Sequence, residues 1–246
     1  TALAYARADH VFITNGDCLQ FARAIGVTRY SPMIHPVDES LYRNERTDPG
    51  ALRQRFGVDV LLYCPIRHDW AVKGNDVFIR LLPELRRRLA GRTFKLVFSP
   101  WGADVERSRA LVRELGCDDL VEWHGPWHRQ QFIRMIRACD VVLDQMILPC
   151  FGATAPEAIA SGTPVIMSYD QKSTDWIIDE PAPILSARTQ EQALDCIMRA
   201  LDPEYREQFR QTSLQWFLKN HSAQRLIDEH LRVYQSVAGK PFRPAS

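Results

Sequence analysis

One short segment, residues 150–166, contains the residue types needed to bind a phosphorylated ligand. Gly152 predicts a tight backbone turn, and the residues after it predict a helix whose free N–H groups and positive dipole end attract an anion. Glu157 would lie about a turn and a half inside that helix, too far in to cap it and placed to accept hydrogen bonds from ligand hydroxyls. Gly162 and Pro164 end the helix before an apolar strand, so the alternative is an ordinary turn, helix and strand of an α/β domain.

Two cations are placed to join this cradle. Arg67 directly follows an apolar strand pattern over 59–65, and Lys73 opens the next helical pattern. In open α/β sheets ligands bind outside the carboxyl ends of the strands, so both side chains are expected at one cavity with Gly152. A planar Arg fork and a mobile Lys charge suit the negative charge that develops on a leaving diphosphate. His68 is a rival to Arg67, and the alternative for both cations is solvation by water.

Aromatic residues at predicted strand ends offer a surface for a base. Trp70, Trp101 and Trp127 each lie beside such an end, and Pro126-Trp127 is the best candidate for stacking. Packing without a ligand explains a large aromatic side chain at a loop edge equally well.

The composition is that of a folded globular protein. The 246 residues, 46% of them hydrophobic, can bury a substantial core. The formal net charge of +1, from 31 basic and 30 acidic residues, gives no electrostatic case for general nucleic-acid binding. The 6 cysteines are scattered without metal-ligand spacing, which fits a reducing cytoplasm. No apolar run approaches the roughly 20 residues of a membrane span, and no signal-peptide pattern opens the chain.

Several motif classes are missing from the sequence. The 7 His are isolated and no Asp-x-Asp pair occurs, so neither a catalytic metal nor a cofactor is expected. No Gly-x-Gly-x-x-Gly follows a strand and no Gly-rich loop ends in Gly-Lys-Ser/Thr, which argues against a dinucleotide oxidoreductase and a P-loop enzyme. The basic cluster Arg86–Arg88 with Arg92 resembles an anion patch, but cations at a helix end are explained by the helix dipole and by solvent.

Short apolar runs rich in β-branched residues alternate with helical patterns, which is typical of a parallel sheet wound with helices. The predicted strands cover residues 10–14, 31–35, 59–65, 94–99, 120–124, 140–144, 163–168 and 183–185. The predicted helices cover residues 17–25, 74–90, 103–115, 128–138, 153–161 and 189–200, followed by 203–219 and 222–237. The polar segment 39–58 is interpreted as a connector. The pattern predicts an α/β fold with a doubly wound, Rossmann-like parallel sheet and right-handed crossovers.

The same residues carry a resemblance to a family. Phe-Gly, four residues, Glu-Ala and then Ala-x-Gly-x-Pro-Val-Ile over 151–166 resemble the donor-site signature of retaining GT-B glycosyltransferases of family 4. Residues 8–12 and 34–38 resemble the segments that close the family's N-terminal domain and enter its C-terminal one. Residues 123–125 and 138–143 resemble the Phe-x-Gly before the nucleobase loop and the strand before the signature.

The resemblance covers nearly the whole chain and lacks the family's preceding, acceptor-binding half. It implies the C-terminal part of a longer enzyme, with a Rossmann-like C-terminal domain of a GT-B fold. We expect residues 1–40 to be a remnant of the N-terminal domain with the interdomain connector, residues 41–220 to be the nucleotide-sugar-binding domain, and residues 221–246 to be an amphipathic helix and tail.

The resemblance also implies roles for single residues. The family's Gly-Arg-x-x-x-x-Lys-Gly pattern falls on Arg67 and Lys73, with one extra residue between them and Ile66 in place of the Gly, and gives these cations the catalytic role. The implied donor contacts are Phe151, Gly152, Ala153, Thr154, Ala155 and Glu157, together with Gly125, Pro126 and Trp127. The family's first sugar-contacting Glu falls on Pro149. Asp144 and Gln145 could replace it, although a strand-end Asp that binds backbone N–H groups is the simpler interpretation.

The implied function is the donor-binding half of a retaining glycosyltransferase that moves a hexosyl group from a nucleotide sugar, with UDP expected, to a hydroxyl acceptor in glycan or glycolipid synthesis. The acceptor, a glycan or a lipid-linked molecule, would bind the N-terminal domain, so this chain is expected to bind donor without transferring sugar at an appreciable rate. A cytoplasmic enzyme is expected, with peripheral membrane association of the complete protein left open. The alternatives are another GT-B activity, such as an epimerase or a phosphorylase, and a non-catalytic nucleotide-binding module.

Overall fold

The computed structural model describes residues 2–43, 49–125 and 127–239 as a parallel α/β fold with two sheets. The strands are β1 (Val11–Ile13), β2 (Tyr30–Pro32), β3 (Val60–Cys64), β4 (Phe94–Phe98), β5 (Val121–Trp123), β6 (Val141–Leu143), β7 (Val165–Met167) and β8 (Leu185–Ser186). All eight predicted strands are confirmed. Strands such as β3 are runs of buried apolar residues, which leave little freedom in where a strand lies, whereas β2 and β8 are short and only partly buried.

Helices connect these strands. They are α1 (Ala2–Ala6), α2 (Gly16–Ala24), α3 (Glu39–Arg43), α4 (Gly50–Phe56), α5 (Asn75–Arg80), α6 (Leu82–Arg88), α7 (Val105–Glu114), α8 (Arg129–Ala138), α9 (Thr154–Ser161), α10 (Gln190–Ala200), α11 (Pro203–Asn220) and α12 (Ala223–Ala238), with short 3-10 turns η2 (Asp118–Leu120) and η3 (Gln171–Ser173).

The larger sheet has six parallel strands in the order β5-β4-β3-β6-β7-β8. Its first strand, β3, lies in the middle. Strands β4 and β5 are added on one side of β3 and strands β6 to β8 on the other, so the strand order reverses between β3 and β6, as in a Rossmann fold. The doubly wound sheet is therefore confirmed. Ligand sites in such sheets lie in the crevice outside the carboxyl ends of the two strands at the reversal.

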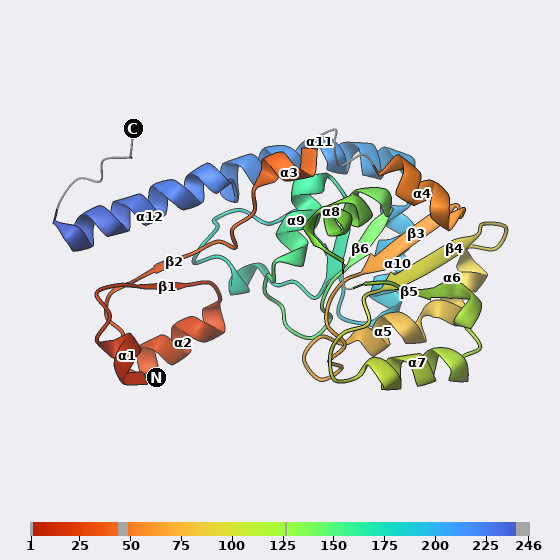
Figure 1. Cartoon of the computed structure of the whole chain (residues 1–246), viewed down its shortest axis with the longest axis horizontal. Coiled ribbons are helices and arrows are strands. Elements are labelled where there is room, and N and C mark those ends of the chain that lie inside the picture. The colour runs from red at the N-terminus through yellow and green to blue at the C-terminus, as the bar shows by residue number, and fades with distance from the viewer. Residues whose placement is uncertain (1, 44–48, 126, 240–246) are drawn as a thin grey trace.

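Helices cover both faces of this sheet, so its central strands are apolar throughout (Figure 1). All five residues of β3 are fully buried. Alternate side chains point to opposite faces: Leu62 packs with α5, α6, α7 and α10, and Leu61 and Tyr63 pack with α3, α4, α8, α9 and α11.

A second, smaller unit lies to one side of the main sheet (Figure 1). It consists of the parallel pair β1 and β2 with α1 and α2, and its own small core is formed by Ile13, Leu19, Ala22 and Val27. Helix α12 reaches this unit, where His230 stacks on Phe12 with ring centroids 4.1 Å apart.

The junction between α11 and α12 holds the segment that joins the two units. The His221 Nε2–H donates to the His35 carbonyl at 2.8 Å, and Glu39 accepts a hydrogen bond from the Ala223 N–H at 3.0 Å. His221 also packs against the ring of Phe151. Residues far apart in the sequence thus fasten the entry to the main sheet.

Two expectations about helices were wrong. The helix predicted over 74–90 is divided into α5 and α6, because Pro83 has no N–H to continue the hydrogen-bond ladder. The segment 39–58, interpreted as a connector, contains α3 and α4. Asp38 accepts hydrogen bonds from the N–H and hydroxyl of Ser40 at the start of α3, and Arg53 of α4 pairs with Asp140 at 2.8 Å.

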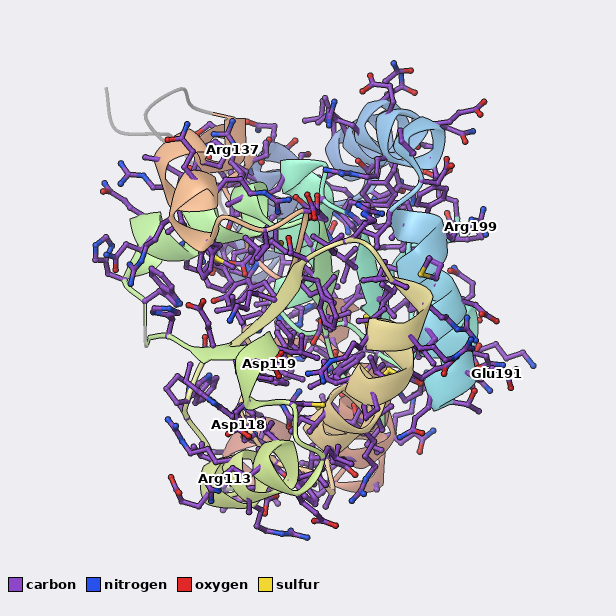
Figure 2. The ribbon with its side chains drawn as sticks, turned by 90° about the vertical axis from the view of Figure 1, so that its right-hand side faces the viewer. Arg113, Asp118, Asp119, Arg137, Glu191 and Arg199 are labelled. Atoms are coloured by element: carbon purple, nitrogen blue, oxygen red, sulfur yellow. The ribbon has the colours of Figure 1, made fainter. Side chains whose placement is uncertain are left out.

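Charged side chains mark the side of the sheet away from the strands' carboxyl ends. Arg113, Arg137 and Arg199 lie in the last turns of their helices, and Asp118 and Asp119 lie just before β5 (Figure 2). Cations at helix C-termini interact favourably with the helix dipole. In the described part of the chain no helix is both long and apolar enough to cross a membrane.

Candidate functional site

A cavity of about 650 Å³ lies at the carboxyl ends of β3 and β6, where the sheet order reverses. Its lining comes from the segments after β3, β4 and β6, including Val72 and Lys73 just before α5, and from the starts of α8 and α9. The cavity brings together most of the predicted site residues, namely Arg67, Lys73, Trp127, Gly152, Ala153, Thr154 and Glu157.

Three of the described residues that were predicted as donor contacts do not line the cavity. Phe151 is buried and stacks on Tyr169 with centroids 5.4 Å apart, and Ala155 is buried inside α9. Gly125, with φ of +118°, lies beneath the indole of Trp127. Pro126 lies outside the described residues. Phe151 and Ala155 are therefore buried next to the residues that line the cavity at the start of α9.

The start of α9 is open to an anion. Its N-cap residue, Ala153, has no side-chain acceptor for the N–H groups of the first turn, and Pro156 has no N–H. The backbone at Gly152 does not require a glycine, because its φ is not positive and a Cβ there would meet nothing within 4 Å. The missing side chain instead leaves free space in the cavity beside the helix N-terminus.

Lys73 is held by the segment after β6. Its ammonium donates to Gln145 Oε1, and its carbonyl accepts the Met146 N–H at 2.8 Å. The Gln145 side-chain amide in turn donates to the carbonyls of Leu148 at 3.2 Å and Cys150 at 2.6 Å. Gln145 therefore joins the catalytic candidate Lys73 to the loop that leads to Gly152, a role that sequence reasoning missed.

Arg67 and His68 point to different places. Arg67 pairs with Asp69 at 3.2 Å, and its side chain is 45% exposed beside the cavity. His68 is fully buried, bonds Ser108 at 2.8 Å and packs against the ring of Phe98. Burial lowers the pKa of His68 to about 4. The structure thus places Arg67, and not its rival His68, at the cavity.

The backbone beside His68 is closely approached by Gly102. Its φ is +114°, and a Cβ there would clash with the His68 backbone. The His68 N–H also donates to the Trp101 carbonyl at 2.7 Å. A glycine is required here, which fixes the segment that carries Arg67.

Glu157 lies in the first turn of α9 and lines the cavity. Its side chain is buried and pairs with Arg129, the first residue of α8, which also lines the cavity. Burial raises the pKa of Glu157, although the Arg129 guanidinium acts in the opposite direction. Sequence reasoning missed Arg129, because its partner lies on another helix.

The three tryptophans differ in their surroundings. Trp127 lines the cavity, and its indole N–H is buried without a partner among the described residues. Trp101 also lines the cavity, is half-exposed and donates to the Pro65 carbonyl at 3.0 Å. Trp70 is used in packing, since its indole donates to Ser108 at 2.9 Å. Two of the three are thus available to a base.

Asp144 follows β6 and is buried at the cavity wall. Its Oδ1 accepts the Gln145 N–H at 2.7 Å, as expected for a strand-end Asp. Its Oδ2 has no hydrogen-bond partner among the described residues. Burial raises the pKa of Asp144 to about 6, against the opposing effects of the Gln145 N–H, the Lys73 charge and the Ala155 N–H.

The arginine cluster that resembled an anion patch is paired with carboxylates. Arg86, Arg87 and Arg88 pair with Asp119, Glu84 and Asp195, respectively. Within the described residues no group of three or more His, Cys, Asp or Glu side chains is arranged to hold a metal ion.

Comparison with known proteins gives consistent results. Residues 66–216 match the family model described as glycosyl transferases group 1. Relatives include D-inositol 3-phosphate glycosyltransferases of Nocardia farcinica, 36% identical over 169 residues, and of Saccharomonospora viridis, 32% identical over 176 residues. These alignments cover 65% and 66% of the chain but only 38% and 41% of the two relatives.

Solved structures share the fold. Anabaena HepE in complex with UDP and glucose has a TM-score of 0.78 at 15% identity, over 95% of this chain and 65% of that one. A glycosyltransferase from Rickettsia africae has a TM-score of 0.76 at 14% identity, over 96% of this chain and 66% of that one. The C-terminal domain of a group 1 glycosyl transferase from Francisella tularensis has a TM-score of 0.59 at 20% identity, over 76% of this chain and 98% of that domain.

The fold likeness agrees with the α/β, Rossmann-like architecture of GT-B glycosyltransferases. The family model spans more than half of the chain and includes Arg67, Lys73 and the start of α9. The chain therefore belongs to the glycosyl transferases group 1 family.

Proposed function

We propose that the chain is the donor-binding part of a retaining glycosyltransferase that transfers a hexosyl group from a UDP-sugar to a hydroxyl acceptor in glycan or glycolipid synthesis. One observation carries the proposal: Arg67, Lys73 and the uncapped start of α9 line a single cavity at the strand-order reversal. Support also comes from the glycosyltransferase names of the relatives and from the UDP bound to structural neighbours.

The proposed reaction breaks the bond between the sugar's anomeric carbon and the diphosphate oxygen, and forms a bond from that carbon to the acceptor oxygen on the same face. The acceptor proton passes to the leaving phosphate, so the protein supplies charge and position rather than a base. Arg67 and Lys73 stabilise the negative charge that develops on the phosphate, and the backbone over 152–155 holds it.

The nucleoside would occupy the wall formed by α8 and α9. Glu157 accepts hydrogen bonds from the ribose hydroxyls, and Arg129 keeps this carboxylate oriented toward the cavity. The indole of Trp127 lies beside the base. The family resemblance also gives Gly125 and Pro126 a base-contacting role. No metal takes part in this proposal, because the two cations and the helix N-terminus offset the diphosphate charge.

The acceptor would bind a preceding domain, and the complete protein would act in the cytoplasm or at a membrane surface. The chain spans about two fifths of the curated relatives that it matches. On its own it is proposed to bind donor without transferring sugar at an appreciable rate, because holding the acceptor in place contributes roughly 7–11 kcal/mol.

Calorimetry on the chain tests the donor site. UDP and UDP-glucose should bind, and UDP at about 100 times its dissociation constant should add roughly 2.7 kcal/mol to the free energy of unfolding. ADP and GDP serve as comparison ligands and should bind more weakly. Absence of binding by every nucleotide and nucleotide sugar would overturn the proposed function.

A further inference from the structure

The cavity contains a carboxylate for which the proposed reaction has no use. Asp144 has 1% of its surface exposed, at the end of β6, and its Oδ2 has no partner among the described residues. A buried oxygen without a partner costs free energy, and native structures rarely keep one without a reason. The position of Asp144 on the cavity wall indicates that a ligand supplies the missing hydrogen bond.

Among the described residues of the loop after β6, the other polar side chain with an acceptor, Gln145, already accepts a hydrogen bond from Lys73. The loop contributes the apolar Leu148 to the cavity, and its next residue is Pro149. The Pro149 carbonyl accepts hydrogen bonds from the Asp170 N–H at 3.2 Å and from the Ser173 hydroxyl. This loop is therefore fastened to η3, and the nearest carboxylate that faces the cavity from this strand end is Asp144.

Two consecutive hydrogen bonds join Lys73 to Asp144. Lys73 donates to Gln145, and Gln145 donates its backbone N–H to Asp144 Oδ1. Lys73 and the start of α9 attract an anion. Asp144 lies beside both, since the Lys73 charge and the Ala155 N–H of α9 act on its carboxylate, and its Oδ2 would accept a hydrogen bond from a neutral hydroxyl and repel an anion. A diphosphate with a sugar attached has these two chemistries in adjacent groups.

Resting on the donor-binding function above, we propose that Asp144 Oδ2 binds a hydroxyl of the donor's sugar and so selects which sugar the site accepts. The nearby Lys73 charge favours the ionised carboxylate, which is the form that accepts such a hydrogen bond. Burial makes the contact selective, because a sugar without a hydroxyl at that place leaves the carboxylate unpaired.

The test compares affinities for UDP and UDP-sugars, measured by calorimetry at pH 7.5 on the wild-type chain and on Asp144→Asn. The ligands are UDP, UDP-glucose, UDP-galactose and UDP-N-acetylglucosamine. We expect at least one sugar nucleotide to bind the wild type more tightly than UDP does. Asp144→Asn should weaken the affinity for that ligand roughly 10- to 100-fold, which is the effect of removing one hydrogen bond to a charged group. The affinity for UDP should fall by no more than about threefold, or should rise.

A second measurement identifies the hydroxyl. Among the deoxy derivatives of the best-binding sugar nucleotide, the one that lacks the bound hydroxyl should bind the wild type and Asp144→Asn equally well. Asp195→Asn is the control, because Asp195 is exposed on α10 and pairs with Arg88 away from the cavity. This variant should leave all affinities unchanged.

The outcomes separate the two proposals. If the wild type binds neither UDP nor any UDP-sugar, the proposed function is wrong and the role of Asp144 with it. If UDP binds but no sugar improves on it, or if Asp144→Asn weakens UDP and the UDP-sugar equally, only the role of Asp144 is wrong. An unchanged UDP-sugar affinity in Asp144→Asn also refutes that role.

Discussion

Removing the charge of Asp144 should stabilise the ligand-free chain. The carboxyl has an ordinary pKa of 3.8, and burial raises this pKa to about 6 in the fold. The folded state therefore binds a proton more tightly than the unfolded state between these values. The protonated Asp144 carboxyl therefore contributes to the free energy of unfolding, and this contribution is fully present below pH 3.8 and is lost as the pH rises through about 6. At neutral pH the ionised, buried group then costs about 3 kcal/mol.

Asp144→Asn removes this cost and keeps an oxygen that can accept the Gln145 N–H. Urea unfolding should show a gain of up to about 3 kcal/mol at pH 7.5 and about 1 kcal/mol at pH 4.5. Asp195→Asn is the control, since its exposed ion pair with Arg88 contributes at most about 1 kcal/mol. A loss of stability in Asp144→Asn at pH 7.5, or a gain that does not depend on pH, would refute the reasoning.

Three further predictions concern the cavity and its support. In a complete enzyme, Lys73→Ala and Arg67→Ala should each slow turnover roughly 10²- to 10³-fold, as measured by steady-state kinetics; a larger effect from His68→Ala without loss of folding would contradict the buried position of His68. Glu157→Gln should weaken UDP binding in calorimetry and leave kcat nearly unchanged, because ribose contacts are the same in the ground and transition states; a drop in kcat at saturating donor would give Glu157 another role. Gly102→Ala should destabilise the chain by roughly 1–3 kcal/mol in urea unfolding, and by more than Gly91→Ala, since both glycines have positive φ but only Gly102 faces a backbone; equal losses would show that the approach to His68 is not tight.

The strands and the cations could be predicted because their signals are local. A buried parallel strand such as β3 requires an uninterrupted apolar run, and the residue after it must lie at the carboxyl edge of the sheet. Arg67 and Lys73 were placed at the cavity on that argument alone, and Gly162 correctly ended α9 with a left-handed φ of 72°.

The contacts that arrange the site are not local, and no pattern in the sequence announces them. Arg129 and Glu157 are 28 residues apart, and Lys73 and Gln145 are 72 residues apart. The first pair forms because α8 and α9 pack against each other, and the second forms because β3 and β6 are adjacent strands of the sheet. Gly152 shows a different limit: the sequence signals a turn, whereas the glycine's place beside the helix N-terminus leaves space for a ligand.

The hydrogen bond from His221, at the α11–α12 junction, to the His35 carbonyl has a consequence for folding during translation. The ribosome makes His35 186 residues before His221, and Phe12 still earlier relative to its partner His230. During translation, the contacts of β1 and of the segment after β2 with the α11–α12 junction and with α12 can therefore form only after almost the whole described chain has emerged. Contacts of such long range slow folding, and apolar surface that waits for its partner is exposed to aggregation.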